Sequence, residues 1–148
     1  MKRLHIHLAV DDLAKNIDFY SALFQSAPSV READYAKWLL DDPRVNFAIS
    51  SRGRQPGLDH LGIQVESGAE LEAVQQNLAA AELPVAAQKQ ANCCYAQSDK
   101  YWTVDPQGIA WEAFHSLQTI PLFGDDQVLQ LEPASSCCKP PAADSAAQ

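Results

Sequence analysis

The sequence predicts an α+β fold in which two tandem βαβββ modules form a sheet that curls around a cavity. The order strand, helix, strands occurs twice, and each time the first strand carries a histidine. The composition also changes near residue 118, after which large apolar residues become rare. We therefore expect one domain over residues 1–118, with half-modules at about 1–55 and 56–118. Residues 119–148 are predicted to form a flexible tail that contains Cys, Pro and Ala.

The first half contains an alternating strand, an amphipathic helix and two further strands. The expected segments are a strand at 4–10, a helix at 11–24, and strands at 35–42 and 44–50. Asp11 or Asp12 is a suitable N-cap for the helix. The apolar residues of this helix recur at helical spacing, at Leu13, Ile17, Tyr20 and Phe24. The two last strands are joined at the turn signal Asp42-Pro43.

The second half repeats this order. A strand is predicted at 58–66 and a helix at 67–83, with Leu71, Val74 and Leu78 on one face of the helix. Four short strands follow, at 84–88, 93–98, 100–104 and 109–114. The last two are joined by a turn that reads Asp-Pro-Gln-Gly.

The charge of the chain excludes several classes of partner. The net charge is −8 and the isoelectric point is near 4.8. A nucleic-acid surface needs a basic patch, and docking on an anionic membrane needs basic residues, so we expect neither partner. The apolar run at the N-terminus is short and broken by His5 and His7, which is unlike a signal peptide or a spanning helix. We therefore expect a cytoplasmic protein.

His5, His60 and Glu112 are the candidate metal ligands. His5 and His60 occupy equivalent positions in the two halves, on the strand face that we expect to point into the cavity. Glu112 lies in the apolar strand IAWEAF, where a carboxylate is costly unless it is paired or bound to a metal. Two histidines and one carboxylate form a facial triad that suits Fe(II) or another divalent ion, and catalytic zinc uses the same ligand types.

The structural alternatives apply to the same residue types. A lone histidine on a strand is more often a surface or core residue than a ligand, and we interpret His7 and His115 in this way. Gly62, beside His60, is expected to leave room for a ligand. The turn alignment of the two halves puts Ile49 opposite Glu112, which would leave three protein ligands.

The 4 cysteines occur as two adjacent pairs, Cys93–Cys94 and Cys137–Cys138. Neighbouring cysteines cannot bridge each other without strain, so in a reducing cytosol such a pair is better suited to bind a soft metal or metalloid. Cys93 and Cys94 can converge only in a bent segment or loop, because adjacent strand residues point to opposite faces. Lys100 lies close in the sequence and could supply positive charge.

Three aromatic residues are candidates for lining the cavity. They are Tyr101 and Trp102, beside Lys100, and Trp38 in the first half. The alternative is that they are ordinary core residues, because aromatic side chains on strands are usually packed in a core.

Several segments together resemble the vicinal oxygen chelate superfamily, which is also called the glyoxalase/bleomycin-resistance/dioxygenase superfamily. HIHLAVDDLAKNIDFYSALF is similar to its opening strand and helix, and LDHLGIQVE and DPQGIAWEAF are similar to its metal-binding strands. CCYAQSDKYWTVDPQGIAWE resembles the branch called ArsI/CadI, which contains organoarsenical C–As lyases and cadmium-induced proteins. The resemblance covers roughly residues 1 to 116.

The resemblance implies a role for each of these residues. His5, His60 and Glu112 would bind a catalytic Fe(II), although some members of the family carry Gln at the position of His5. Cys93 and Cys94 would capture a trivalent organoarsenical, and O2 would serve as co-substrate for cleavage to arsenite. Members of the family are often dimers, which implies a homodimer here.

Two other functions stay open from the sequence. The protein could bind cadmium or another thiophilic metal without turnover, as the two thiol pairs and the acidic charge suggest. It could also be a glyoxalase-type isomerase or an extradiol dioxygenase, although those reactions need no soft ligands. A metal site shared between the two chains of a dimer is a further alternative.

Overall fold

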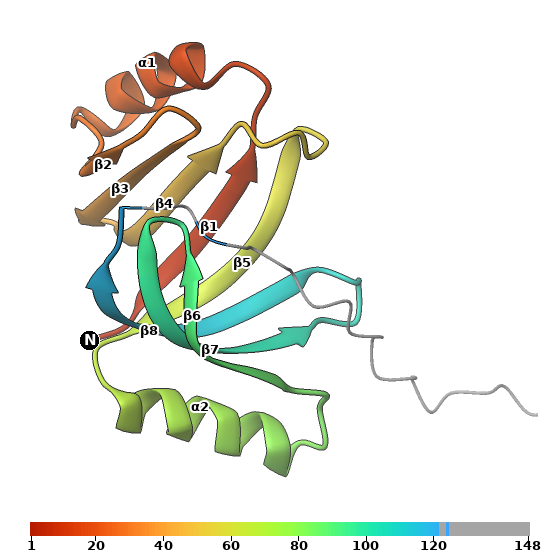
Figure 1. The fold of residues 1–148 in the computed structure, drawn as a ribbon. Helices are drawn as coiled ribbons and strands as arrows, with labels where there is room; N and C mark the ends of the chain where they lie inside the picture. The colour runs from red at the N-terminus through yellow and green to blue at the C-terminus, as the bar shows by residue number, and fades with distance from the viewer. Residues whose placement is uncertain (122–123, 125–148) are drawn as a thin grey trace, which may run out of the picture.

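The computed structural model describes residues 1–121 and Gly124, and it contains the predicted curled sheet (Figure 1). Eight strands form one sheet in the order β2-β3-β4-β1-β5-β8-β7-β6. This order corresponds to two βαβββ modules joined edge to edge, which confirms the predicted fold class. The tail that was predicted over residues 119–148 lies almost entirely outside the described residues.

The bounds of the elements are as follows. The first module contains β1 (Arg3–Ala9), α1 (Leu13–Phe24), β2 (Val30–Arg31), β3 (Tyr35–Asp41) and β4 (Arg44–Ser50). The second module contains β5 (Gly57–Val65), α2 (Gly68–Ala80), β6 (Ala86–Cys93), β7 (Ala96–Val104) and β8 (Ala110–Thr119).

Pairing of the two opening strands joins the modules. β1 and β5 run antiparallel to each other in the middle of the sheet. Each is also parallel to the last strand of its own module, β1 to β4 and β5 to β8. A parallel pair needs a long connection, and the helix and hairpin strands of each module provide it. The candidate ligands on β1, β5 and β8 therefore lie on three neighbouring strands.

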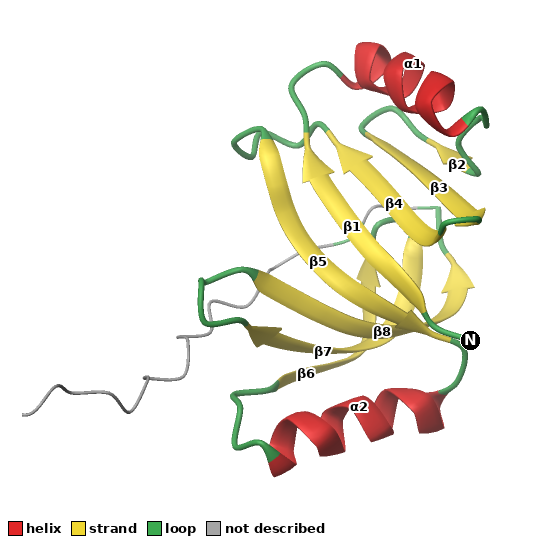
Figure 2. Ribbon diagram, turned by 180° about the vertical axis from the view of Figure 1, so that it is seen from behind, coloured by secondary structure: helices red, strands yellow, loops and turns green. Residues whose placement is uncertain are grey.

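The two helices cover the outer face of the curled sheet at its two ends (Figure 2). Asp12 caps α1 by accepting a hydrogen bond from the backbone N–H of Lys15, and Ser67 caps α2 in the same way through Glu70. The core beneath α1 contains Ile17, Trp38, Phe47 and other apolar side chains. A second, smaller core beneath α2 contains Val65, Leu71 and Ala113. Because side chains alternate along a strand, the opposite face of the sheet is left to line the cavity.

The strands around the cysteine pair differ from the prediction. The predicted strands at 93–98 and 100–104 are one continuous strand, β7, and β6 extends through Cys93. The short strand β2 was not predicted, because two residues carry no readable alternation. Neither α1 nor α2, within the described part of the chain, has the length and apolar character that a membrane crossing requires.

We predict that the core beneath α2 depends on Leu71, which is only 1% exposed. Leu71→Ala should lower the free energy of unfolding by about 2–5 kcal/mol, because it removes buried methyl groups and leaves a cavity. Leu23→Ala on α1, where the side chain is 60% exposed, is the matched control and should change it by less than about 0.5 kcal/mol. Urea denaturation measures both, and equal losses would contradict the assignment of this core.

Candidate metal centre and adjacent thiols

Three side chains converge inside the curl, and they come from three strands: His5 from β1, His60 from β5 and Glu112 from β8. The Nε2 atoms of His5 and His60 lie 3.3 Å apart, and each lies 3.5 Å from Oε1 of Glu112. Ligands at about 2.1 Å from an ion and at right angles to each other are about 3 Å apart. The three atoms therefore form a triangle close in size to one face of a coordination octahedron. All three candidate donors belong to the same chain.

The outer hydrogen bonds of the two histidines also suit a metal site. Nδ1 of His5 donates to the backbone carbonyl of Asn46 at 2.9 Å, and Nδ1 of His60 donates to the Asp59 carboxylate at 2.7 Å. Metal-binding histidines usually donate the other ring N–H to such an oxygen, which fixes the tautomer. In both rings, Nε2 is therefore the nitrogen directed at the shared centre. The donor set and its outer partners fit a divalent ion.

Lys100 holds the far oxygen of the carboxylate. Its ammonium lies 3.1 Å from Oε2 of Glu112, and both side chains are almost completely buried. The same ammonium lies 5.6 Å from the centre of the Trp102 ring, a cation–π distance. Because Lys100 engages Oε2, Oε1 is the carboxylate oxygen that faces the two histidines.

The protonation of the three candidate ligands follows from burial and from these partners. Burial lowers the pKa of His5 to about 4, although the Glu112 charge opposes the shift. Burial also disfavours charge on His60, but hydrogen bonds to Asp59 and Glu112 outweigh it and raise the pKa of His60 to about 9. Burial raises the pKa of Glu112, but the Lys100 charge and the histidines outweigh it and hold this pKa well below its usual value.

Gly62 makes room for Glu112 rather than for a ligand, which corrects the sequence interpretation. The two residues are direct partners in the β5–β8 pairing. A Cβ atom on Gly62 would lie 2.5 Å from the backbone oxygen of Glu112 and 2.9 Å from its Cγ. A side chain at this position would therefore displace the strand that carries the carboxylate.

The cysteine pair lies at the hairpin turn between β6 and β7. Cys93 pairs with Ala96, so Cys94 and Tyr95 form a two-residue turn. Both turn residues have positive φ, 58° and 60°, which fits a type I′ hairpin but is unusual without glycine or asparagine. The Tyr95 hydroxyl donates to the Asp34 carboxylate at 2.7 Å and ties the turn to the first module. Cys94 thus lies in a tight turn, and Cys93 is the strand residue directly before it.

A small hollow of about 30 Å³ is lined both by the cysteine pair and by two of the three candidate metal ligands. Its lining includes both cysteines together with His5, Lys100 and Glu112. One water molecule needs about 10–15 Å³ on this measure, so the hollow accepts only a small group as it stands. The thiols therefore lie on the same side of the sheet as Glu112.

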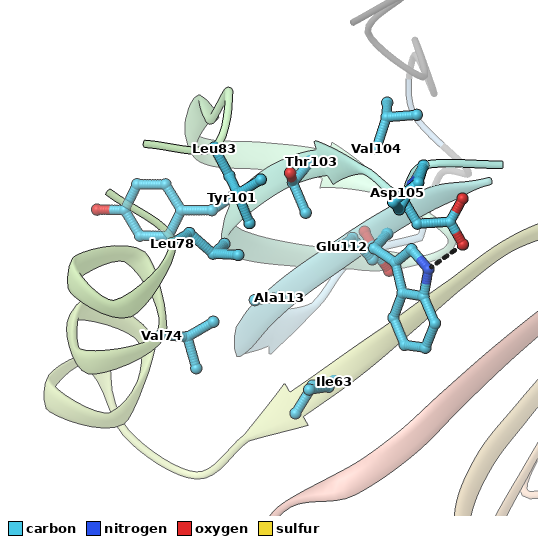
Figure 3. Close-up of a pocket in the computed structure, with 12 residues that line it drawn as sticks. Ile63, Val74, Leu78, Leu83, Tyr101, Thr103, Val104, Asp105, Glu112 and Ala113 are labelled. Carbon is cyan, nitrogen blue, oxygen red and sulfur yellow. Dashed lines mark hydrogen bonds between the residues drawn. The ribbon is translucent and has the colours of Figure 1, made fainter. Parts of the chain in front are cut away.

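Tyr101 and Trp38 do not line the cavity, which corrects the interpretation of these two residues as candidates for its lining. Tyr101 points to the outer face and lines an apolar pocket of about 350 Å³ beneath α2 (Figure 3). Trp38 packs in the core beneath α1. The reason is strand alternation, which puts Tyr101 on the opposite face from Lys100 and Trp102. Trp102 does face the cavity, with its ring centre 5.2 Å from that of His60.

Two residues lie near the site although the sequence did not assign them to it: His7 was interpreted as a surface or core residue, and Lys37 was not considered. His7 is 2% exposed, and its ring centre lies 4.8 Å from that of His60. Its position on the same strand face as His5 was the available signal. Lys37 on β3 lines the hollow, and its charge interacts with Cys94. The sequence contains no pattern that relates Lys37 to the cysteines, because the proximity of Lys37 to Cys94 depends on the strand order.

Comparison with known proteins gives a family and close relatives. A family model described as the Glyoxalase/Bleomycin resistance protein/Dioxygenase superfamily matches residues 2–113. The chain is 42% identical over 125 residues to a "trivalent organoarsenical cleaving enzyme" of Bacillus sp. strain MD1, covering 81% of this chain and 76% of that protein. It is 34% identical over 125 residues to the "cadmium-induced protein CadI" of Mycobacterium tuberculosis, with 84% and 82% covered. These relatives confirm the resemblance found in the sequence.

Solved structures agree on the fold. The chain matches homoprotocatechuate 2,3-dioxygenase from Arthrobacter globiformis with a TM-score of 0.59 and 17% identity, over 80% of this chain and 37% of that one. It matches methylmalonyl-CoA epimerase from Mycobacterium tuberculosis with a TM-score of 0.58 and 17% identity, over 77% and 87%. At this level of identity, these matches support the curled-sheet fold alone.

We predict that Gly62→Ala damages the candidate metal centre through the backbone of Glu112. Its Cβ atom forces β8 to move, so the free energy of unfolding should fall by about 1–3 kcal/mol. Binding of Co(II), measured by titration with an optical readout, should weaken in parallel. Gly68→Ala is the matched control, because its Cβ would meet no atom within 4 Å. Wild-type stability and affinity in Gly62→Ala would contradict the close approach.

We also predict that acid destabilises the metal-free protein through His5. Between pH 6.5 and about 4 the unfolded chain takes up a proton at this residue and the folded chain does not. The free energy of unfolding should therefore fall as the pH falls, by up to about 1.4 kcal/mol for each pH unit. In urea denaturation at several pH values, His5→Gln should show a smaller fall than wild type. Identical pH dependence in His5→Gln and wild type would refute the prediction.

Proposed function

Because the chain belongs to the glyoxalase/bleomycin resistance protein/dioxygenase superfamily, in the branch of organoarsenical-cleaving and cadmium-induced proteins, we propose that it is a C–As lyase. In this proposal it uses Fe(II) and O2 to convert trivalent organoarsenicals to arsenite. The observation that carries the proposal is the shared hollow, in which two adjacent thiols meet two candidate metal ligands. A site for a hard-metal reaction alone would need no thiol pair.

The two sets of residues perform different tasks in this proposal. Cys93 and Cys94 are soft donors, and as thiolates they capture trivalent arsenic from a small substrate. Lys37 of the first module lines the same hollow; burial lowers its pKa, and the charge of a Cys94 thiolate would oppose this shift, so the two groups attract each other. Capture at the β6–β7 turn holds the organic group of the substrate beside His5 and Glu112. The thiols thus supply substrate binding and position.

The metal ligands supply the reactive part of the site. His5, His60 and Glu112 would hold Fe(II) or another divalent ion, and that ion would provide open positions for the chemistry of dioxygen. Asn46 and Asp59 keep the two imidazoles in the tautomer that directs Nε2 inward. For methylarsenite, the atoms balance when CH3As(OH)2 and O2 give formaldehyde and As(OH)3. The C–As bond breaks, the carbon is oxidised and O2 is reduced.

A second candidate function is the sequestration of cadmium or a similar thiophilic metal without turnover. The observation that favours it is the 34% identity to a protein named for induction by cadmium. In that case Cys93 and Cys94 are the essential ligands, and loss of Glu112 has no effect on resistance. The cytoplasmic location and the homodimer that we expect from the sequence stay predictions.

We predict that capture and cleavage can be separated by mutation. Iron-loaded, reduced protein is mixed with methylarsenite without oxygen and then exposed to air, and arsenite and formaldehyde are measured. Glu112→Ala should retain arsenic binding and lose release of arsenite by at least about 100-fold, because the metal loses a ligand. The double variant Cys93→Ser/Cys94→Ser should lose arsenic binding itself.

The tail pair provides the matched control. Cys137→Ser/Cys138→Ser removes the same number of thiols and should release arsenite as wild type does. Absence of arsenite release from the iron-loaded wild type in air would exclude the lyase. Full cadmium resistance of cells that carry Glu112→Ala, with none in the Cys93→Ser/Cys94→Ser strain, would favour sequestration.

A further inference from the structure

The repeat provides four equivalent positions around the centre, and one of them lacks a donor. His5 in the first module corresponds to His60 in the second. The strand registers pair His7 with Ala48 and Gly62 with Glu112, so Ala48 on β4 is the counterpart of Glu112 on β8. The sequence alignment that placed Ile49 there was wrong by one residue, and Ile49 lies in the core beneath α1. The first module therefore has a methyl group where the second has a carboxylate.

His7 occupies the space beside Ala48. Its side chain lies on the same strand face as His5 and is 2% exposed. One ring nitrogen of each of His5, His7 and His60 lies within 4.8 Å of the others. Two ligands on opposite sides of an ion are about 4.2 Å apart, so a small shift of one ring brings all three into coordination range.

The hydrogen bonds of His7 follow the pattern of the other two histidines. Its Nε2 lies 3.0 Å from the Ser50 hydroxyl, as the outer nitrogens of His5 and His60 lie near Asn46 and Asp59. Its Nδ1 is buried without a hydrogen-bond partner among the described residues. A buried ring nitrogen without a partner is costly, and a metal ion would satisfy it. When Nε2 donates to Ser50, Nδ1 carries the lone pair that a metal needs.

We propose that His7 is a fourth protein ligand, which completes a three-histidine, one-carboxylate centre. The inference rests on the metal centre of the proposed function and adds a donor that the facial triad lacks. In this proposal, the His7 imidazole takes the place of the carboxylate that the repeat would put at Ala48. A six-coordinate ion would then keep two open positions instead of three, enough for one small co-substrate beside the captured arsenical.

The test counts histidine ligands in the intact protein. Each neutral imidazole that binds Co(II) keeps one ring N–H, which gives one strongly shifted, exchangeable proton signal in the NMR spectrum. We expect three such signals from wild-type protein loaded with Co(II) and two from His7→Gln. His115→Gln, which changes a histidine away from the centre, should keep three. Two signals from the wild type would overturn the assignment of His7.

Metal affinity gives a second readout. Titration with Co(II) should show that His7→Gln binds at least about tenfold more weakly than wild type, and Ser50→Ala should show a smaller loss. Equal Co(II) affinity of His7→Gln and wild type would also overturn the proposal. If the wild type binds no Co(II) at all, the metal centre of the proposed function fails together with this inference. Binding with only two histidine signals removes His7 alone and leaves the facial triad in place.

Discussion

The contacts of the buried Glu112 carboxylate with its charged and imidazole partners are the constraint on which the candidate site depends. Glu112 is 6% exposed, and removing such a charge from water costs several kcal/mol unless partners compensate. Its partners are Lys100 on β7, His5 on β1 and His60 on β5. Each comes from a different strand, so the order and register of the second module and its junction with the first must be kept. Gly62 lets β5 and β8 approach closely enough for this arrangement.

Much of this architecture could be predicted from the sequence, because the repeat carries it. The equivalent histidines in two alternating strands indicated which face of each strand lines the cavity. The apolar strand around Glu112 indicated this carboxylate as the third candidate metal ligand. The other features of the site depend on strand pairing, which cannot be read from the sequence. The role of Gly62, the counterpart of Glu112 at Ala48 and the proximity of Lys37 to Cys94 all follow from register or strand order. Tyr101 was misplaced although alternation already assigned it to the outer face.

In the proposed function, the thiol pair gives the cavity a second kind of chemistry. The carboxylate of Glu112 and the imidazole of His5 are hard and borderline donors. The two soft donors, Cys93 and Cys94, lie at the turn of the β6–β7 hairpin. That turn holds two residues other than glycine at positive φ, a conformation that costs energy and persists where the surroundings enforce it. The hydrogen bond from Tyr95 to Asp34 is one such restraint. In the proposed function, this strained turn holds the two thiols that bind the substrate.

In the proposed function, a soft substrate and a metal ion occupy one cavity together. Anomalous X-ray diffraction from a crystal loaded with Fe(II) without oxygen and soaked with a trivalent organoarsenical tests it most directly. We expect an arsenic peak between the sulfurs of Cys93 and Cys94 and an iron peak between His5, His60 and Glu112, both on the cavity face of the sheet. Iron bound at the thiols, or arsenic bound with no metal at the histidines, would contradict the claim.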